Sequence, residues 1–249
     1  MRKHILLLCI LFGAAYADTV QMPDGSTYLG NLQTGLFHGH AIQIWENGDK
    51  YEGEFKDGLY NGKGKLTTRL YVYEGDFLNG MQTGRGKILL SNGAKYEGEV
   101  KDGLYDGHGK LVDVAGNISS GTFQNGYLNG EGVMILKNGD SFYGHFVNGL
   151  LQGKGVYKNE AGDYYVGNFK DNYFDGEGKL TLSTGKVYTG VFSRGNLPEE
   201  YLKSKNKVVL LPVLIILFLI SSCINIFCIM TLSKRNIKTE GMHARKKKV

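Results

Sequence analysis

The segment that makes up most of this chain contains no cysteine. The three cysteines of the sequence are Cys9, in an apolar run near the N-terminus, and Cys223 and Cys228, in a second apolar run near the C-terminus. No disulfide can therefore form among the residues between the two runs, even in an oxidising compartment. We expect packing alone to stabilise that intervening segment.

The sequence also shows no constellation of reactive groups of the kind that catalysis requires, since its carboxylates mostly recur at solvent-face positions of a repeat. Once the terminal segments and the repeats described below are set aside, nothing of domain size remains to form a pocket with convergent reactive groups. His38 and His40 would share a strand face, but a zinc site needs three or four ligands, and no cysteine is available. The G-x-G pairs precede no helix that could present its N-terminus to a phosphate. We expect no enzymatic activity, metal site or cofactor.

The N-terminus has the order of a secretory signal. Arg2 and Lys3 precede an apolar run over residues 5–12, and small residues follow at Ala15 and Ala17. This order predicts a signal peptide over residues 1–17, cleaved after Ala17. The alternative is a retained membrane anchor, but crossing the hydrocarbon core takes roughly 20 apolar residues, and this run is shorter.

A second apolar run, over residues 208–232, contains no charged residue. A buried helix of a soluble protein normally carries a polar face, and this run has none. Its length is enough to cross a bilayer with some tilt. We therefore predict a transmembrane helix at 208–232, preceded by a juxtamembrane linker at 196–207.

The basic tail over residues 233–249 gives the orientation. It carries seven Lys and Arg against one Glu, and positive charge favours the cytosolic side. Together with the signal peptide, this predicts a single-pass type I protein with its repeats outside the cell or in a lumen. Lys246 and Lys247, fourth and third from the C-terminus, resemble a dilysine retrieval signal of the endoplasmic reticulum. The alternatives are a plasma-membrane or other endomembrane protein whose tail only fixes topology or contacts anionic lipid.

The charge of the intervening segment argues against two classes of partner. Residues 18–207 hold 20 Lys and Arg against 23 Asp and Glu, a net charge of −3, so the +5 of the whole chain comes from its ends. This balance argues against nucleic acid as a partner of that segment, and against binding to anionic lipid.

An internal repeat runs through residues 24–195. Its reference point is a glycine that recurs every 23 residues, with one step of 22. An aromatic residue usually stands two positions before this anchor glycine and an apolar residue two positions after it. A further glycine follows at position +5, where Asn172 is the one substitute, and a G-x-G pair at +9 and +11. The anchor glycines are Gly30, Gly53, Gly75, Gly98, Gly121, Gly144, Gly167 and Gly190. The pattern gives seven full copies and a partial eighth.

Three copies illustrate the repeat-defining residues. They are Tyr51, Gly53, Phe55, Gly62 and Gly64 in one copy, Tyr96, Gly98, Gly107 and Gly109 in another, and Tyr165, Gly167, Phe169, Gly176 and Gly178 in a third.

The alternation within each copy predicts a β-hairpin with one buried face. We expect residues 56–61 to form the loop of one hairpin, and dipeptides such as Asn47-Gly48 to turn the chain into the next copy. Strand-interior glycine allows another group to approach the backbone closely. We therefore expect the aromatic residue of one copy to cover the glycines of the neighbouring copy.

This pattern closely resembles the MORN (membrane occupation and recognition nexus) repeat. The resemblance implies an all-β, elongated, single-layer array of antiparallel hairpins. In the family, such arrays act as scaffolds, adaptors and sometimes lipid-associated modules, and its enzymes carry a separate catalytic domain. A signal peptide and a transmembrane anchor depart from the usual family pattern.

Two further features concern partners and modification. Tyr60, Tyr105, Tyr127 and Tyr173 recur after the glycine at +5; they either cover the hairpin edge or form a ridge that binds a protein. Asn117 begins the one N-x-[ST] sequon of the chain and is a candidate for glycosylation. The leading hypothesis is a non-catalytic scaffold or protein-binding adaptor, and the alternative is a lipid-binding module that tethers or shapes membranes. Self-association of the array stays open.

Overall fold

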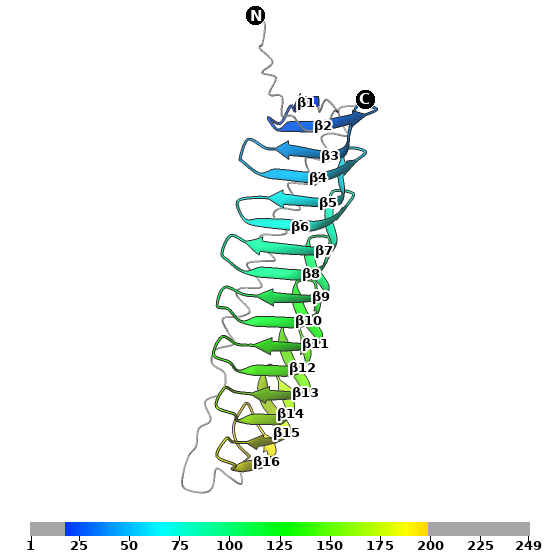
Figure 1. Cartoon of the computed structure of the whole chain (residues 1–249). Helices are drawn as coiled ribbons and strands as arrows, with labels where there is room; N and C mark the ends of the chain where they lie inside the picture. The colour runs from blue at the N-terminus through cyan, green and yellow to red at the C-terminus, as the bar shows by residue number, and fades with distance from the viewer. Residues whose placement is uncertain (1–17, 199–249) are drawn as a thin grey trace, which may run out of the picture.

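The computed structural model describes residues 18–198, which form a single antiparallel sheet of 16 strands (Figure 1). Its strands are β1 (Asp18–Gln21), β2 (Thr27–Gln33), β3 (Leu36–Ile44), β4 (Lys50–Lys56), β5 (Leu59–Thr67), β6 (Tyr71–Leu78), β7 (Met81–Leu90), β8 (Lys95–Lys101), β9 (Leu104–Val112), β10 (Ile118–Gln124), β11 (Tyr127–Ile135), β12 (Ser141–Val147), β13 (Leu150–Lys158), β14 (Tyr164–Lys170), β15 (Tyr173–Thr181) and β16 (Val187–Phe192). The predicted signal peptide, transmembrane helix and basic tail lie outside these residues, as does the predicted linker beyond Pro198. Among residues 18–198, no helix is long and apolar enough to cross a membrane.

The order of the strands in the sheet is their order along the chain. Each strand therefore pairs only with its sequence neighbours, and the array extends from β1 at one end to β16 at the other (Figure 1). The all-β array of hairpins predicted from the repeat is confirmed over the described residues.

The hairpin loops are shorter than predicted. Lys56 pairs with Leu59, so the loop of this hairpin consists of Asp57 and Gly58 alone. Both have positive φ, 51° and 80°, as a type I′ turn requires, and the twist of this turn matches that of the flanking strands. The predicted loop over residues 56–61 is therefore wrong, because residues 59–61 already belong to β5. Asn172, with φ of 69°, occupies the glycine position as its residue type predicts.

The turns between copies contain the predicted Asn-Gly dipeptides. In the turn that joins β3 to β4, the Trp45 N–H donates to the Asp49 carbonyl, and the Gly48 N–H donates to the Trp45 carbonyl. Gly48 has φ of 86°, which glycine adopts at little cost. Asn47-Gly48 thus turns the chain into the next copy, as expected.

Each hairpin is bent at its anchor glycine. In a straight strand, residues four apart lie about 13 Å from each other, yet the ring centroids of Tyr51 and Phe55 are only 5.1 Å apart. The strand register shifts between Gly53 and Phe55, and the opposing Gly62 has φ of 81°. This irregularity is a β-bulge, which bends a strand and here folds the hairpin over its own aromatic ring.

The aromatic ring covers the glycines of its own hairpin. Gly53 and Gly64 are paired across β4 and β5, and a side chain on either would collide with the ring of Tyr51. The same relation joins Tyr73 to Gly75 and Gly86. The prediction that the aromatic covers the glycines of the neighbouring copy is therefore wrong, because the bend returns each ring to the hairpin it comes from.

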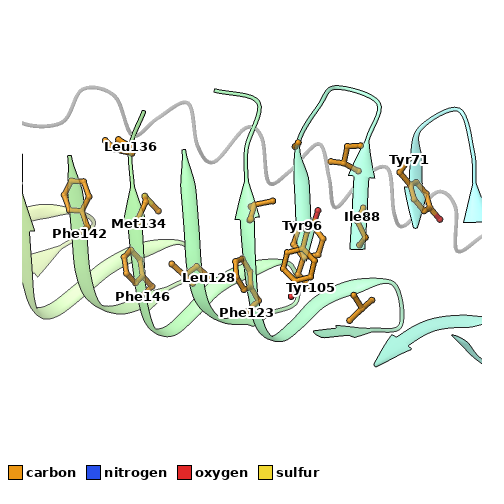
Figure 2. Close-up of a cluster of buried hydrophobic side chains, with 14 of the residues drawn as sticks. Tyr71, Ile88, Tyr96, Tyr105, Phe123, Leu128, Met134, Leu136, Phe142 and Phe146 are labelled. Carbon is orange, nitrogen blue, oxygen red and sulfur yellow. The ribbon is translucent and has the colours of Figure 1, made fainter. Parts of the chain in front are cut away.

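Neighbouring copies are joined by packing between aromatic rings. Tyr51 stacks on Tyr60 within its own hairpin, with centroids 3.7 Å apart, and meets the edge of Phe77 from the next copy at 5.1 Å. Such stacked and edge-to-face pairs stabilise beyond the area that they bury. Figure 2 shows this row continuing through Tyr96, Tyr105 and Phe123 to aliphatic and aromatic side chains of the later copies.

Candidate interaction surface

The four tyrosines of the predicted ridge do not lie on one surface. Tyr60 and Tyr105 are buried, with 8% and 1% of their surface exposed, while Tyr127 is half-buried and Tyr173 is exposed. The first two stand seven positions after their anchor glycines and the other two stand six. Successive strand residues point to opposite faces, so a single exposed ridge is wrong. Tyr60 and Tyr105 instead line the interior, where each stacks on the aromatic residue before its anchor glycine.

The inward tyrosines have structural hydrogen bonds. The Tyr51 hydroxyl donates to the backbone carbonyl of Glu54, three residues on, and the same bond recurs in other copies. The equivalent pairs are Tyr28 with Asn31, Tyr73 with Asp76, Tyr96 with Glu99 and Tyr165 with Asn168. Burial raises the pKa of Tyr165 to about 12, so its hydroxyl remains a donor at neutral pH. The tyrosines of the inner face therefore stabilise the bent hairpins.

The predicted glycosylation residue, Asn117, is buried in the turn between β9 and β10. Its Nδ2, the atom to which a glycan is attached, donates to Asp113 Oδ2 at 2.8 Å, and its Oδ1 accepts from the Lys137 N–H at 2.9 Å. A glycan on Asn117 would require this turn to open. In the folded array, Asn117 connects two neighbouring turns.

The two histidines considered as metal ligands lie on β3, where His38 is half-buried and His40 is exposed. Within residues 18–198, no group of three or more His, Cys, Asp and Glu side chains is arranged to hold a metal ion. Lys246 and Lys247, the candidates for the retrieval signal, lie outside the described residues.

The outward face of the sheet has a regular charge pattern over β4 to β9. One row on this face is formed by the residue before each anchor glycine and its cross-strand neighbours. We call its charged part the charged segment: Glu52, Lys65, Glu74, Lys87, Glu97 and Lys110. Acidic and basic residues alternate, so each charge faces the opposite sign across the strands. Lys87 and Glu97, for example, are 3.2 Å apart.

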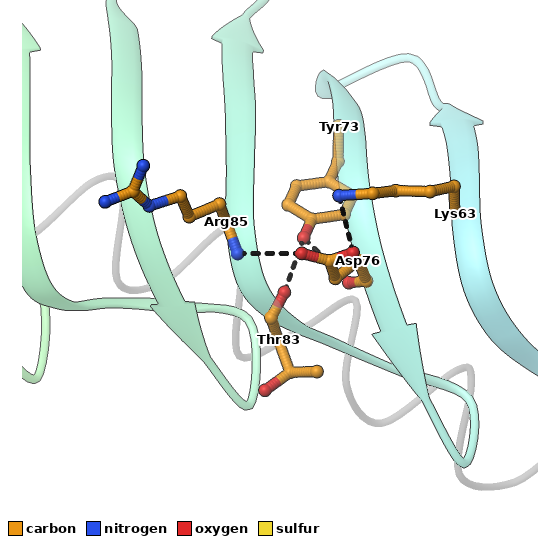
Figure 3. A network of polar contacts seen from close by, with 5 residues as sticks. All are labelled: Lys63, Tyr73, Asp76, Thr83 and Arg85. Carbon is orange, nitrogen blue, oxygen red and sulfur yellow. Dashed lines mark hydrogen bonds and ion pairs between the residues drawn. The ribbon is translucent and has the colours of Figure 1, made fainter.

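A parallel row beside the charged segment is also paired, as Figure 3 shows around Asp76. The Asp76 carboxylate lies 2.6 Å from the Lys63 ammonium and accepts the Arg85 backbone N–H at 3.0 Å. Burial alone would raise the pKa of Asp76, but the bonds from Lys63 and Arg85 outweigh it and hold the pKa below its usual range. This half of the outward face satisfies its own charges and is suited to water.

The same face becomes apolar over β11 to β14. We call this the apolar segment: Val133, Ile135, Tyr143, Val156, Tyr164 and Val166. Val133 pairs with Tyr143, Tyr143 with Val156, and Val156 with Val166, in the row that carries alternating charge further up the array. Tyr143 is 43% exposed and Val166 48% exposed. Exposed apolar side chains that form a contiguous group, unlike scattered ones, mark interaction sites.

The apolar segment is flanked by charges of both signs. Lys158 and Lys154 lie on β13, and His145 Nδ1 lies 3.3 Å from Glu131 on the neighbouring strand. Ser141, which pairs with Ile135, is buried. An apolar centre with a polar, mixed-charge rim is the anatomy of a protein interface.

Sequence reasoning missed the apolar segment. The signal is present in the sequence, because the residue before the anchor glycine is Glu52, Glu74 and Glu97 in three copies but Tyr143 and Val166 in two later ones. A comparison of the outward positions from copy to copy, rather than of the invariant ones, would have found it.

Comparison with known proteins agrees with this architecture. The family model described as the MORN repeat matches seven segments: residues 28–50, 51–69, 73–95, 96–118, 120–141, 142–164 and 165–187. A comparison with curated proteins finds no significant match.

Two solved structures are similar to this chain at low sequence identity. One is the G-box domain of the microcephaly protein CPAP, 14% identical, with a TM-score of 0.41 over 71% of this chain and 99% of that one. The other is the TCP domain of SAS-4 (dCPAP) from Drosophila melanogaster, in complex with a proline-rich motif of Ana2 (dSTIL). It is 14% identical, with a TM-score of 0.30 over 76% of this chain and 99% of the other.

Proposed function

This chain belongs to the MORN repeat family, and we propose that it is a single-pass type I membrane protein whose repeat array is a non-catalytic scaffold that binds protein. The observation that carries the proposal is the apolar segment. At positions where earlier copies have charged pairs, Tyr143, Val156 and Val166 are left partly exposed to water. Burying these side chains against a partner is favourable by roughly 25 cal/mol per Å² of apolar surface.

The composition around the apolar segment supports a protein partner over a lipid bilayer. The net charge of residues 18–207 is −3, which does not favour anionic lipid. Glu131 and Glu177 flank the segment together with Lys154, Lys158 and Lys179, so the rim carries both signs rather than the uniformly positive charge that anionic lipid attracts.

A lipid-binding role is the second candidate. Tyr143 and Tyr164 are exposed beside Lys158, and tyrosine is enriched where proteins meet the membrane interface. Vesicles of neutral lipid and vesicles with anionic lipid separate the two candidates when mixed with residues 18–198, which form the complete sheet. We expect no co-sedimentation with either. Binding that is lost in Tyr143→Ser and in Tyr164→Ser would replace the protein-binding proposal with the lipid-binding one.

Binding of protein is tested on the full-length chain in its membrane. Val166→Lys places a charge in the apolar segment, and Glu74→Lys places the same side chain at the same repeat position in the charged segment. With a photo-reactive residue in place of Tyr143, we expect crosslinking to capture protein in the chain without a further substitution and in Glu74→Lys, but at least tenfold less in Val166→Lys. Equal capture in all three would remove the apolar segment as the binding surface.

The topology is tested with a new sequon, because Asn117 is buried. Asp49→Thr converts turn residues 47–49 into Asn-Gly-Thr, and the acceptor Asn47 is exposed. A type I orientation predicts that microsomes add a glycan to this variant. Protease digestion of the repeats in intact microsomes, with no glycan added, would contradict the proposed topology.

The location in the endoplasmic reticulum is tested through the same glycan. Retrieval through Lys246 and Lys247 predicts that the glycan of Asp49→Thr stays sensitive to endoglycosidase H. The double substitution Lys246→Ser and Lys247→Ser should make it resistant. A resistant glycan on the chain with both lysines present would exclude the retrieval signal.

A further inference from the structure

The residues of the apolar segment are arranged symmetrically about the boundary between β12 and β13. Consider a twofold axis that lies outside the outward face, runs parallel to the strands and passes over this boundary. It sets β12 of one copy opposite β13 of the other, and β11 opposite β14. Tyr143 then faces Val156 of a second copy, because these two are direct cross-strand neighbours in one copy.

The same operation matches the rest of the apolar segment. Val133 on β11 is brought opposite Val166 on β14, and Ile135 opposite Tyr164. The two residues of each pair lie equally many strands from the axis, on opposite sides of it, and at the same position along their strands. Apolar residues thus meet apolar residues throughout, as a self-complementary twofold interface requires.

The polar residues around the apolar segment are also compatible with this arrangement. Lys158 is brought opposite Ser141, and Lys179 on β15 opposite Ser120 on β10. Lys154 and His145 lie beyond the bend at Gly144, where the two outward faces diverge, and His145 has Glu131 3.3 Å away on its own sheet. No carboxylate faces another carboxylate, a juxtaposition that would oppose association.

The overlap contains the whole apolar segment and, except for Lys110 on β9, leaves the charged segment outside it. The axis superposes β9 to β16 of one copy on β16 to β9 of the other, because β16 is the last strand among residues 18–198. Glu52, Lys65, Glu74, Lys87 and Glu97 lie on β4 to β8 and remain outside the overlap, in water. A parallel pair would superpose the whole length of both arrays and would bury these charges, at a large desolvation cost.

The overlap is large enough for a specific interface. Because each hairpin bends at its anchor glycine, only the roughly four residues between that glycine and the turn between copies lie on one flat face. Eight strands spaced about 4.8 Å apart then present about 520 Å² per copy. The total of about 1,040 Å² exceeds the roughly 1,000 Å² that a specific interface needs. Two sheets packed face to face in this way form an aligned β-sandwich.

We propose that the outward face of β9 to β16 is the interface of an antiparallel homodimer, with the apolar segments of the two copies packed against each other. This names the partner at the surface on which the proposed function rests. Rotation about an axis parallel to the strands leaves the hairpin tips of both copies at the same side. The two Pro198 ends therefore lie at opposite ends of the overlap but on the same side, that of the hairpin tips, which is compatible with anchoring both chains in one membrane.

Cross-linking of paired cysteines distinguishes this register from others. The full-length chain with Cys223→Ser and Cys228→Ser serves as background, and differently tagged copies carry Val133→Cys or Val166→Cys. With a short bismaleimide in membranes, mixed copies should cross-link at least tenfold more than either copy with itself. Lys65→Cys, in the charged segment, should not cross-link to itself, to Val133→Cys or to Val166→Cys. Cross-linking of each variant with itself, without the mixed product, would overturn the antiparallel arrangement.

The mass of the detergent-solubilised chain tests association independently of any cysteine. Light scattering should give twice the chain mass for the unaltered protein and for Glu74→Lys. Val166→Lys should raise the apparent dissociation constant of the dimer at least tenfold. A monomer at every concentration would refute the homodimer. If photo-crosslinking from position 143 then still captured a different protein, the proposed function would stand with another partner.

Discussion

The hydroxyl of Tyr51 donates a hydrogen bond to the backbone carbonyl of Glu54 at a distance of 2.9 Å. Two strand residues three positions apart could not form this bond if β4 were straight, because extended backbone would separate them by about 10 Å. The bond therefore records the bend at Gly53, and it recurs at the same position in other copies. Removing this hydroxyl by a single substitution therefore measures how much the hydrogen bond stabilises the bend.

Tyr51→Phe should lower the free energy of unfolding by about 1 kcal/mol, because it removes one hydrogen bond and keeps the ring. Tyr143→Phe, on the exposed outward face, should change the free energy of unfolding by less than about 0.5 kcal/mol. Denaturant unfolding of residues 18–198 measures both. Equal effects of the two variants would show that the hydroxyl bond does not stabilise the bend.

Alanine should be destabilising at a strand glycine that an aromatic ring covers, and less so at the equivalent glycine of a copy that lacks the ring. A side chain on Gly109 would collide with the ring of Tyr96, so Gly109→Ala should cost about 1–3 kcal/mol through overpacking. In the next copy, Ser119 stands in place of the aromatic, and a Cβ on Gly132 meets its nearest atom only at 3.0 Å. Gly132→Ala should cost clearly less than Gly109→Ala in the same unfolding experiment. The reverse order would show that another group determines these glycines.

Stability should fall at high pH as the buried tyrosines ionise. Burial raises the pKa of Tyr165 from 10.0 to about 12, and raises those of Tyr51, Tyr73 and Tyr96 further. Since the unfolded chain loses these protons first, stability is complete below about pH 10 and decreases as the pH rises toward 12. The Tyr165→Phe variant should lose less stability than the unaltered chain between pH 10 and 12. A pH dependence unaffected by this substitution would contradict the assignment.

The sequon at Asn117 should remain unmodified once the array has folded. Its Nδ2 is bonded to Asp113, and its Oδ1 accepts the Lys137 N–H, so Asn117→Ala should cost about 1–3 kcal/mol through unpaired buried groups. Mass spectrometry of the secretory-pathway product should find no glycan at Asn117, while the Asp49→Thr variant carries one at Asn47. A glycan at Asn117 in a chain with unchanged stability would mean that the turn opens at little cost.

The repeat itself was predictable because the same residue types recur at a fixed spacing along the sequence. The Tyr-x-Gly alternation of Tyr51 and Gly53, and the paired glycines Gly62 and Gly64, establish strand period, hairpin order and the number of copies. These are local properties of the chain, since side-chain direction alternates along any strand. The membrane-directing segments at both ends are likewise predictions from local composition, and they rest on the sequence.

The faces of the array depended on relations that only the folded sheet contains. Whether Tyr60 and Tyr127 share a surface depends on a one-residue difference in position, and strand pairing turns that difference into opposite faces. The two-residue turn at Asp57 and Gly58, and the return of the Tyr51 ring over its own hairpin, follow from the bulge opposite Gly62.

The apolar segment shows the same division. Val133, Tyr143, Val156 and Val166 are separated by 10 to 13 residues along the chain, and each is unremarkable in its own strand. Antiparallel pairing places them side by side because neighbouring strands lie about 4.8 Å apart. The sequence determined the repeating hairpin, since strand period and turns are local. The tertiary structure alone decided which variable residues meet on the outward face, because that depends on register between strands.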